Sequence, residues 1–290
     1  MNGSGEKQES RKQKKDGILI KTTLVDFPSV LSSAFFLPGC NLRCPYCQNR
    51  ELVLPLLLQE QENENLVSIE DLFTHLERRK NVLSGLVISG GEPLLNSRTK
   101  EILSRAKKLG YKTKLDTNGT FPEKLEEILE NPETRPDYVA LDVKTSPEKY
   151  FEMLTEYSRN SVSQNDSQER MKTSQAKAVN TRETATAQNS VPEKLKTALA
   201  EKIKKSIKII SALPPKSYEI RTVLVPGITT KDDIENISSL LNKDASWYLA
   251  HFSNISCLSK TFENLQPYSR EEEQTLLDTA RKRVKNTFLR

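Results

Sequence analysis

The feature that most constrains the fold is an alternation of short apolar strand patterns with helical patterns from residue 17 onward. Strands are expected at 31–37, 85–89, 112–116, 138–143, 220–225 and 247–252, and helices at 68–80, 97–110, 122–130, 232–241 and 269–287. Continuous apolar strands separated by helices indicate a parallel sheet covered by helices. Six such units are too few for a closed eight-stranded barrel. We therefore expect an α/β fold, an open, partial (β/α)6 barrel of parallel strands with outer helices.

Two stretches depart from this pattern. Residues 1–16 are polar and basic, and residues 158–191 are rich in Ser, Asn, Gln and Thr and contain no aromatic residue. Such segments bury too little apolar surface to offset their ordering entropy. We expect a disordered basic tail at 1–16, a disordered insertion at 158–191, and a folded domain over the rest of 17–290.

Composition indicates where the protein acts. A secreted disulfide scaffold carries many dispersed cysteines, whereas this chain has four, three of them clustered. No signal-peptide pattern opens the chain, and no apolar run approaches the ~20 residues of a membrane span. The net charge of +5 comes from runs with interleaved acidic residues, which favours solvated helix faces over nucleic-acid contacts. We expect a cytoplasmic protein without membrane contacts.

Three cysteines within eight residues, Cys40, Cys44 and Cys47, predict the chemistry. Clustered thiolates select a soft metal or an iron–sulfur cluster. Structural zinc sites close with four ligands, and here the next candidate ligand is His75, inside a predicted helix. A four-iron cluster fits better and leaves one iron open to a substrate. The distant Cys257 is an alternative fourth ligand, but a structural thiol is the favoured interpretation.

Polar residues follow three neighbouring strands of the predicted sheet. They are Gly90, Gly91 and Glu92 after the first, Asp116, Thr117 and Asn118 at the end of the second, and Asp142 and Lys144 at the end of the third. The carboxyl ends of parallel strands line the ligand crevice of such folds. We therefore expect these residues to face the same opening as the cysteines. The second histidine, His251, ends a later strand, and its role stays open.

The C-x3-C-x2-C spacing, with Tyr46 before the last cysteine, resembles the signature of radical S-adenosylmethionine enzymes. The Ser-Gly-Gly-Glu-Pro block at 89–93 is similar to the glycine motif of that superfamily. The order of the blocks most resembles the activating enzymes of glycyl-radical enzymes, and among them the anaerobic ribonucleoside-triphosphate reductase activating proteins. The resemblance covers about 17–155 and 193–255.

The resemblance implies a set of cofactors and binding residues. One [4Fe-4S] cluster would be held by the three catalytic cysteines, and S-adenosylmethionine by its open iron. Residues implied to bind S-adenosylmethionine are Tyr46 (near the adenine), Gln48 (where relatives often have His), Gly90, Gly91, Glu92, Asn118, Asp142, Lys144 and Arg221. Asp116, Thr117 and Asp142 match the oxygen donors of a monovalent-cation site.

The implied activity is reductive cleavage of S-adenosylmethionine to a 5′-deoxyadenosyl radical, after reduction by flavodoxin or ferredoxin. The radical would remove a hydrogen atom from a glycine of a partner, with anaerobic ribonucleoside-triphosphate reductase as the expected glycyl-radical enzyme. The first alternative is a small-molecule radical enzyme, similar to a deazaguanine synthase or a maturase. A further one is a non-catalytic metal-binding protein that contacts nucleic acid.

Overall fold

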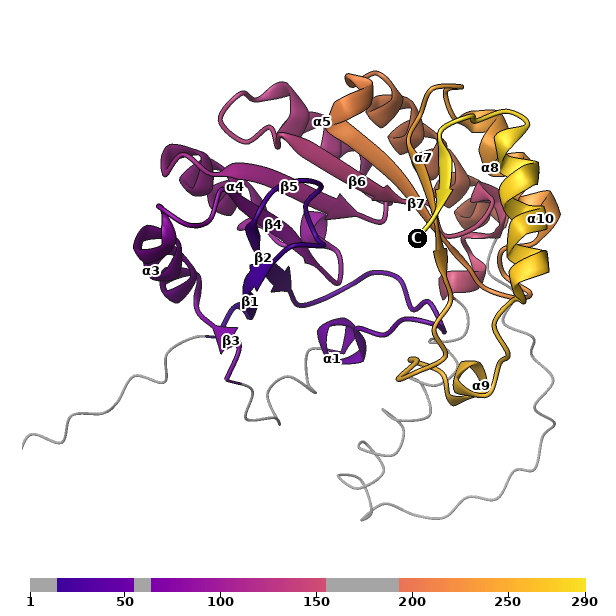
Figure 1. Cartoon of the computed structure of the whole chain (residues 1–290), viewed down its shortest axis with the longest axis horizontal. Helices are drawn as coiled ribbons and strands as arrows, with labels where there is room; N and C mark the ends of the chain where they lie inside the picture. The colour runs from indigo at the N-terminus through magenta and orange to yellow at the C-terminus, as the bar shows by residue number, and fades with distance from the viewer. Residues whose placement is uncertain (1–14, 55–63, 155–192) are drawn as a thin grey trace, which may run out of the picture.

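The computed structural model describes residues 15–54, 64–154 and 193–290 (Figure 1). The predicted insertion at 158–191 lies outside the described residues, and so does the predicted tail except for its last two residues. Asp16 already belongs to the fold, because its backbone N–H donates to Val67 at 2.8 Å and its carboxylate accepts from the Ile69 N–H at 3.1 Å.

The described strands form one nine-stranded sheet in the order β3-β1-β2-β4-β5-β6-β7-β8-β9. Their bounds are β1 Gly17–Thr23, β2 Ser32–Leu37, β3 Leu66–Val67, β4 Gly85–Gly90, β5 Lys112–Thr117, β6 Tyr138–Asp142, β7 Tyr218–Leu224, β8 Trp247–His251 and β9 Thr287–Leu289. All pairs from β2 to β9 are parallel, and β1 pairs antiparallel with β2 and β3. The two edge strands do not pair, so the predicted open, partial barrel is confirmed.

Helices cover the outer face of the curved sheet (Figure 1). The α-helices are α1 Arg50–Val53, α3 Ile69–Arg79, α4 Thr99–Lys108, α5 Pro122–Glu130, α7 Glu193–Ser211, α8 Lys231–Leu240, α9 Lys260–Glu263 and α10 Arg270–Arg281; the short 3₁₀ turns are η1 Pro93–Leu95, η2 Pro147–Lys149 and η3 Pro215–Ser217. The capping box that opens α3 is present, with Ser68 and Asp71 in reciprocal hydrogen bonds. No helix among the described residues is long and apolar enough to cross a lipid bilayer.

The C-terminal segment differs from its sequence prediction. A helix was expected to continue to residue 287, but α10 ends at Arg281 and the chain then forms β9. This strand pairs with β8, Trp247 opposite Thr287, and covers an edge that would otherwise present unpaired backbone groups. The antiparallel strands β1 and β3 were likewise not predicted, so the six expected units carry extensions at both edges.

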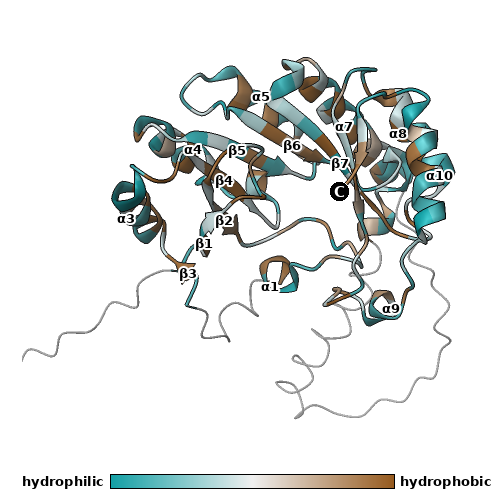
Figure 2. Cartoon of the chain, viewed as in Figure 1, coloured by the Kyte–Doolittle hydropathy of each residue, from teal (hydrophilic) through white to brown (hydrophobic). Residues whose placement is uncertain are grey.

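The two faces of the sheet differ in polarity, as the alternating colours of the strands show in Figure 2. On β8, Trp247 and Leu249 are fully buried in the apolar core. The opposite face carries charges, since Lys114 on β5 and Glu219 on β7 are buried with their Nζ and Oε1 atoms 3.3 Å apart. The barrel interior is therefore polar, and charged groups continue along it to the carboxyl ends of the strands.

Candidate active site

The three cysteines lie on the loop after β2 and all line one cavity of about 270 Å³. Burial raises the pKa of Cys40 to about 11 and that of Cys44 to about 12, and it also raises the pKa of Cys47. Thiols in such a place ionise readily only beside a strong positive charge, such as that of bound iron. The predicted clustering of the cysteines is thus present in the structure.

Gly90, the last residue of β4, and Gly91 after it let this strand pack closely on the cysteine loop. A Cβ on Gly91 would lie 2.6 Å from the carbonyl carbon of Gly39, and Gly90 has a φ of +127°, which L side chains rarely adopt. The Gly91 N–H donates to the Leu37 oxygen at 2.9 Å, and the Glu92 N–H donates to the Gly39 oxygen at 2.8 Å. Both glycines also line the cavity, so the absence of side chains allows the strand to pack on the cysteine loop and leaves room for a ligand in the cavity.

Glu92 does not face the cavity as expected. Its side chain is fully buried and accepts hydrogen bonds from the backbone N–H groups of Leu94 (3.0 Å) and Asn118 (2.7 Å) and from the Thr117 hydroxyl (2.9 Å). Burial raises the pKa of Glu92 to about 7. The carboxylate already has three donors, so it links the ends of β4 and β5, and the expected contact with S-adenosylmethionine stays a prediction.

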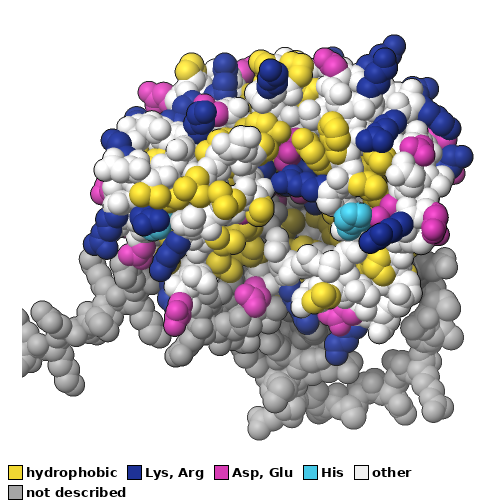
Figure 3. Space-filling view, in the orientation of Figure 1, with side chains coloured by type: hydrophobic (Ala, Val, Ile, Leu, Met, Phe, Trp, Pro, Cys, Tyr) yellow, Lys and Arg dark blue, Asp and Glu magenta, His cyan; other side chains and the backbone are white. Residues whose placement is uncertain are grey.

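Charged residues from three neighbouring strands meet on the opposite wall of the cavity. Arg221 on β7 reaches Asp142 on β6 at 2.6 Å and Asp116 on β5 at 3.2 Å, and Lys144 reaches Asp142 at 2.9 Å. Burial alone would raise the pKa of Asp142, but the two cations outweigh it and hold that pKa below its ordinary value. Lys and Arg side chains gather in this hollow of the molecule (Figure 3).

The expected monovalent-cation donors are only partly brought together. Asp116, Thr117 and Asp142 all line the cavity, but Arg221 lies between the two carboxylates and the Thr117 hydroxyl donates to Glu92. The guanidinium therefore pairs with both carboxylates, and the monovalent-cation site stays a prediction.

Gln48 is not part of the cavity lining. Its side-chain amide donates to the carbonyl oxygens of Ser253 (3.2 Å) and Ile255 (3.3 Å), and the Ser259 N–H donates to the Pro45 oxygen at 2.9 Å. The segment after β8 is thus hydrogen-bonded to the cysteine loop and holds it in place. The sequence held no signal for this contact, because its partners are about 200 residues apart.

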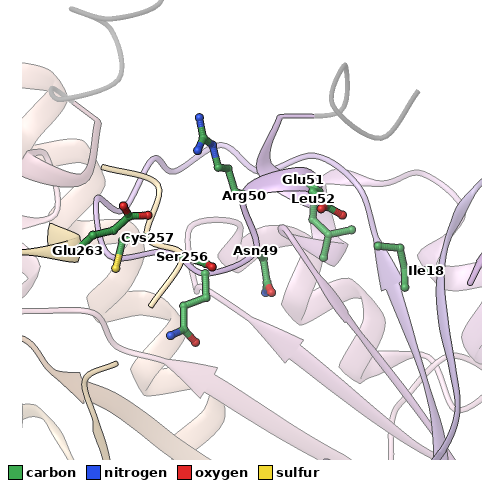
Figure 4. Close-up of a pocket in the computed structure, with 9 residues that line it drawn as sticks. Ile18, Asn49, Arg50, Glu51, Leu52, Ser256, Cys257 and Glu263 are labelled. Atoms are coloured by element: carbon green, nitrogen blue, oxygen red, sulfur yellow. The ribbon is translucent and has the colours of Figure 1, made fainter. Parts of the chain in front are cut away.

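A second pocket of about 560 Å³ lies on the outer side of the cysteine loop (Figure 4). Cys257 lines this pocket beside Glu263 and does not line the cavity of the three clustered cysteines. Neither histidine lines that cavity: His75 contacts the Lys21 oxygen, and Nδ1 of His251 lies 2.7 Å from Glu273. Within the described residues, the three clustered cysteines are thus the only thiol or imidazole groups in that cavity's lining.

The residues present fit a cluster with a bound zwitterion. Three thiols face a cavity whose other wall holds paired acids and bases, and Oδ1 of Asp116 there is buried without a hydrogen bond, 3.5 Å from Nζ of Lys114. The hydroxyl of Tyr46 is also buried without a hydrogen-bond partner, although Tyr46 does not line the cavity. Among the described residues, no three His, Cys, Asp or Glu side chains are arranged to hold a single metal ion.

Comparison with known proteins agrees with this geometry. The model of the Radical SAM superfamily matches residues 35–241. A Methanocaldococcus jannaschii protein named "putative glycyl-radical enzyme activating enzyme" is 30% identical over 277 residues, 94% of each chain. The pyruvate formate-lyase-activating enzyme of Clostridium pasteurianum is 32% identical over 137 residues, 46% of this chain and 53% of that enzyme.

Two further similarities are narrower. A 7-carboxy-7-deazaguanine synthase of Methanocaldococcus jannaschii is 36% identical over 96 residues, 30% of this chain and 39% of that enzyme. The crystal structure of Streptococcus suis SuiB shares the fold, with a TM-score of 0.51 and 14% identity over 87% of this chain and 47% of SuiB. The chain therefore belongs to the radical SAM superfamily, and its cofactors are a [4Fe-4S] cluster and S-adenosylmethionine.

Proposed function

We propose that this protein is an activating enzyme that generates a glycyl radical on a partner enzyme. The observation that carries the proposal is the similarity to a relative of that name over 94% of both chains. When bound, the cluster and S-adenosylmethionine supply an electron transfer that releases methionine and a 5′-deoxyadenosyl radical. The chain's own part is to bind and orient this cofactor and to admit the partner's glycine.

The shape of the crevice supports a polypeptide substrate. The cysteine-lined cavity adjoins a further cavity of about 390 Å³, and the two share Asp26, Asp142, Lys144 and Arg221 in their linings. The wall of this adjoining cavity also includes Val25, from the N-terminal part of the chain, and Arg290, from the C-terminal part. Because the barrel is open, a loop of a partner protein can enter from the side without unfolding either protein.

The charged wall of the cysteine-lined cavity is suited to orient bound S-adenosylmethionine. Arg221 and Lys144 are held by Asp142, so their positions are set before the ligand arrives. Cations placed in this way bind a carboxylate such as that of methionine, and hydrogen bonds to ionised groups are about twice as strong as neutral ones. Oδ1 of Asp116 makes no hydrogen bond and lies 3.5 Å from Nζ of Lys114, so it is suited to accept from a hydroxyl or ammonium group of the same ligand.

The finer parts of the proposal concern the partners. Anaerobic ribonucleoside-triphosphate reductase is the proposed glycyl-radical enzyme, supported by the order of sequence blocks along the chain. Flavodoxin or ferredoxin is the proposed electron donor, since cysteine-ligated clusters reach potentials near or below about −400 mV.

The decisive experiment is electron paramagnetic resonance on anaerobically reconstituted protein mixed with S-adenosylmethionine, a reductant and a candidate glycyl-radical enzyme. We expect a glycyl doublet on the partner and one 5′-deoxyadenosine for each radical formed. The Cys44→Ala variant and a partner with its target glycine replaced by alanine are the controls, and neither should give the doublet. Formation of 5′-deoxyadenosine with no doublet on any candidate from the same genome would refute the activase proposal.

A small-molecule radical enzyme remains the second candidate, favoured by the 36% identity to a deazaguanine synthase over 96 residues. That similarity reaches only 30% of this chain, which is why we place it second. It predicts that 5′-deoxyadenosine formation is stimulated by a small-molecule substrate instead of a protein.

A further inference from the structure

The side chain of Asn118 contacts a cysteine of the cluster loop. Its amide nitrogen lies 3.8 Å from Sγ of Cys40 and 3.1 Å from Oδ1 of Asn41, so each of its two N–H groups has an acceptor. The only other donor to this sulfur in the described residues is the backbone N–H of Leu42, at 3.4 Å. Asn118 is thus a side-chain donor to a cysteine predicted to hold iron.

The orientation of this amide follows from its other contacts. Oδ1 of Asn118 accepts from the backbone N–H of Thr120 at 3.0 Å and from the hydroxyl of Thr120 at 2.6 Å. A backbone N–H can only donate, so the amide oxygen must face Thr120 and the amide nitrogen must face the sulfur. The Thr120 hydroxyl in turn accepts from the Asn41 amide at 2.8 Å, which closes a ring of hydrogen bonds.

The backbone of Asn118 is held from behind by Glu92. The Asn118 N–H donates to Oε2 of Glu92 at 2.7 Å, and both residues are buried, with exposures of 5% and 0%. The other oxygen of Glu92 is occupied by Thr117 and Leu94. The donor therefore sits on a rigid support that ties the end of β5 to the turn after β4.

We propose that Asn118 donates an N–H···S hydrogen bond to the cluster ligand Cys40 and thereby sets the reduction potential of the cluster, with Glu92 as its positioning residue. Uptake of one electron from an external low-potential donor increases the negative charge on the thiolate sulfurs. A hydrogen-bond donor stabilises that more negative form, so its presence raises the potential. The inference uses the cluster alone and is independent of which substrate the protein acts on.

The test is a redox titration monitored by electron paramagnetic resonance, without S-adenosylmethionine or any partner. The Asn118→Leu variant is close in size and has no donor, and Asn118→Ala is the smaller alternative. We expect the equilibrium constant for reduction to fall about tenfold, which for a one-electron couple is a midpoint about 59 mV more negative. The midpoint is independent of the fraction of chains that carry a cluster, so incomplete loading does not obscure the result.

Asn96→Ala is the matched control, because Asn96 caps the turn after β4 and its side chain accepts from Arg98 instead of contacting a cysteine. Its midpoint should equal that of the wild type. If neither Asn118 variant takes up iron, Thr120→Val, which loosens the amide without removing it, provides the measurement. An unchanged or more positive midpoint in the variants that load overturns the inference.

Discussion

The structure predicts that a single methyl group at position 91 displaces the cysteine loop. A Cβ on Gly91 would lie 2.6 Å from the carbonyl carbon of Gly39, still closer to its oxygen, and 3.1 Å from Cβ of Cys40. Real Cβ atoms essentially never approach within 3.0 Å of such neighbours. The obstacle is backbone, so no side-chain rotation relieves it, and the loop that carries the first cysteine must move.

The cost of Gly91→Ala can be worked out from the contacts that move. Overpacking of this kind costs about 1–3 kcal/mol. Displacing the Gly39 carbonyl also weakens the hydrogen bond from the Glu92 N–H, now 2.8 Å long, and a bond of that type contributes about 1 kcal/mol. The total of roughly 2–4 kcal/mol corresponds to a fall in melting temperature on the order of 10 °C.

Iron content after anaerobic reconstitution and the thermal midpoint of the apoprotein are the two measurements. We expect Gly91→Ala to lower both. The control is Gly110→Ala, since Gly110 has a φ of +89° and open space around it, so its substitution costs only backbone strain of about 1–2 kcal/mol and leaves iron uptake unchanged. Full iron uptake and a wild-type midpoint in Gly91→Ala would refute the packing argument.

Three further outcomes are expected. Arg221→Leu leaves Asp142 without its strongest partner, so the unfolding free energy should fall by about 3 kcal/mol at pH 7. The depressed pKa of Asp142 gives the wild type stability that is present above the ordinary value of 3.8 and is lost below it, and the variant should show less of this loss in urea unfolding at low pH. Gln48→Ala should lower stability by about 1 kcal/mol and speed cluster loss in air, unlike the exposed Gln274→Ala. Trp247→Phe removes a buried hydrogen bond to a β7 hydroxyl and should cost about 1–3 kcal/mol in the same unfolding assay, without changing iron content.

The parts of the fold that could be predicted are those with local signals. Strand and helix patterns depend on residues within about ten positions, and the capping box at Ser68 and the helix start at Pro122 were both found correctly. The last strand was missed because three residues carry too little pattern, and because it forms only by pairing with β8.

The prediction of the active site has the same limit, because only contiguous sequence patterns could be recognised. The cysteines and the glycine motif could be read from spacing, since each is a contiguous block. Glu92 belongs to such a block, yet it faces the interior because the register of β4 against β5 brings donors from residues 117 and 118 to its carboxylate. Gln48 could not be placed for a similar reason: its acceptors follow β8, and only the folding of the sheet brings them near.

Neighbouring elements hold the cysteine loop in place, in addition to the hydrogen bonds within the loop. The end of β4 holds it at Gly39, Asn118 at the end of β5 holds Cys40, and the segment after β8 holds Pro45 and Gln48. Two of these supports, Gly91 and Asn118, line the same cavity as the three cysteines, and the lining also includes Asp142 and Arg221. A loop fixed in this way keeps the sulfurs in place while S-adenosylmethionine binds and its products leave, which is the preorganisation that radical chemistry requires.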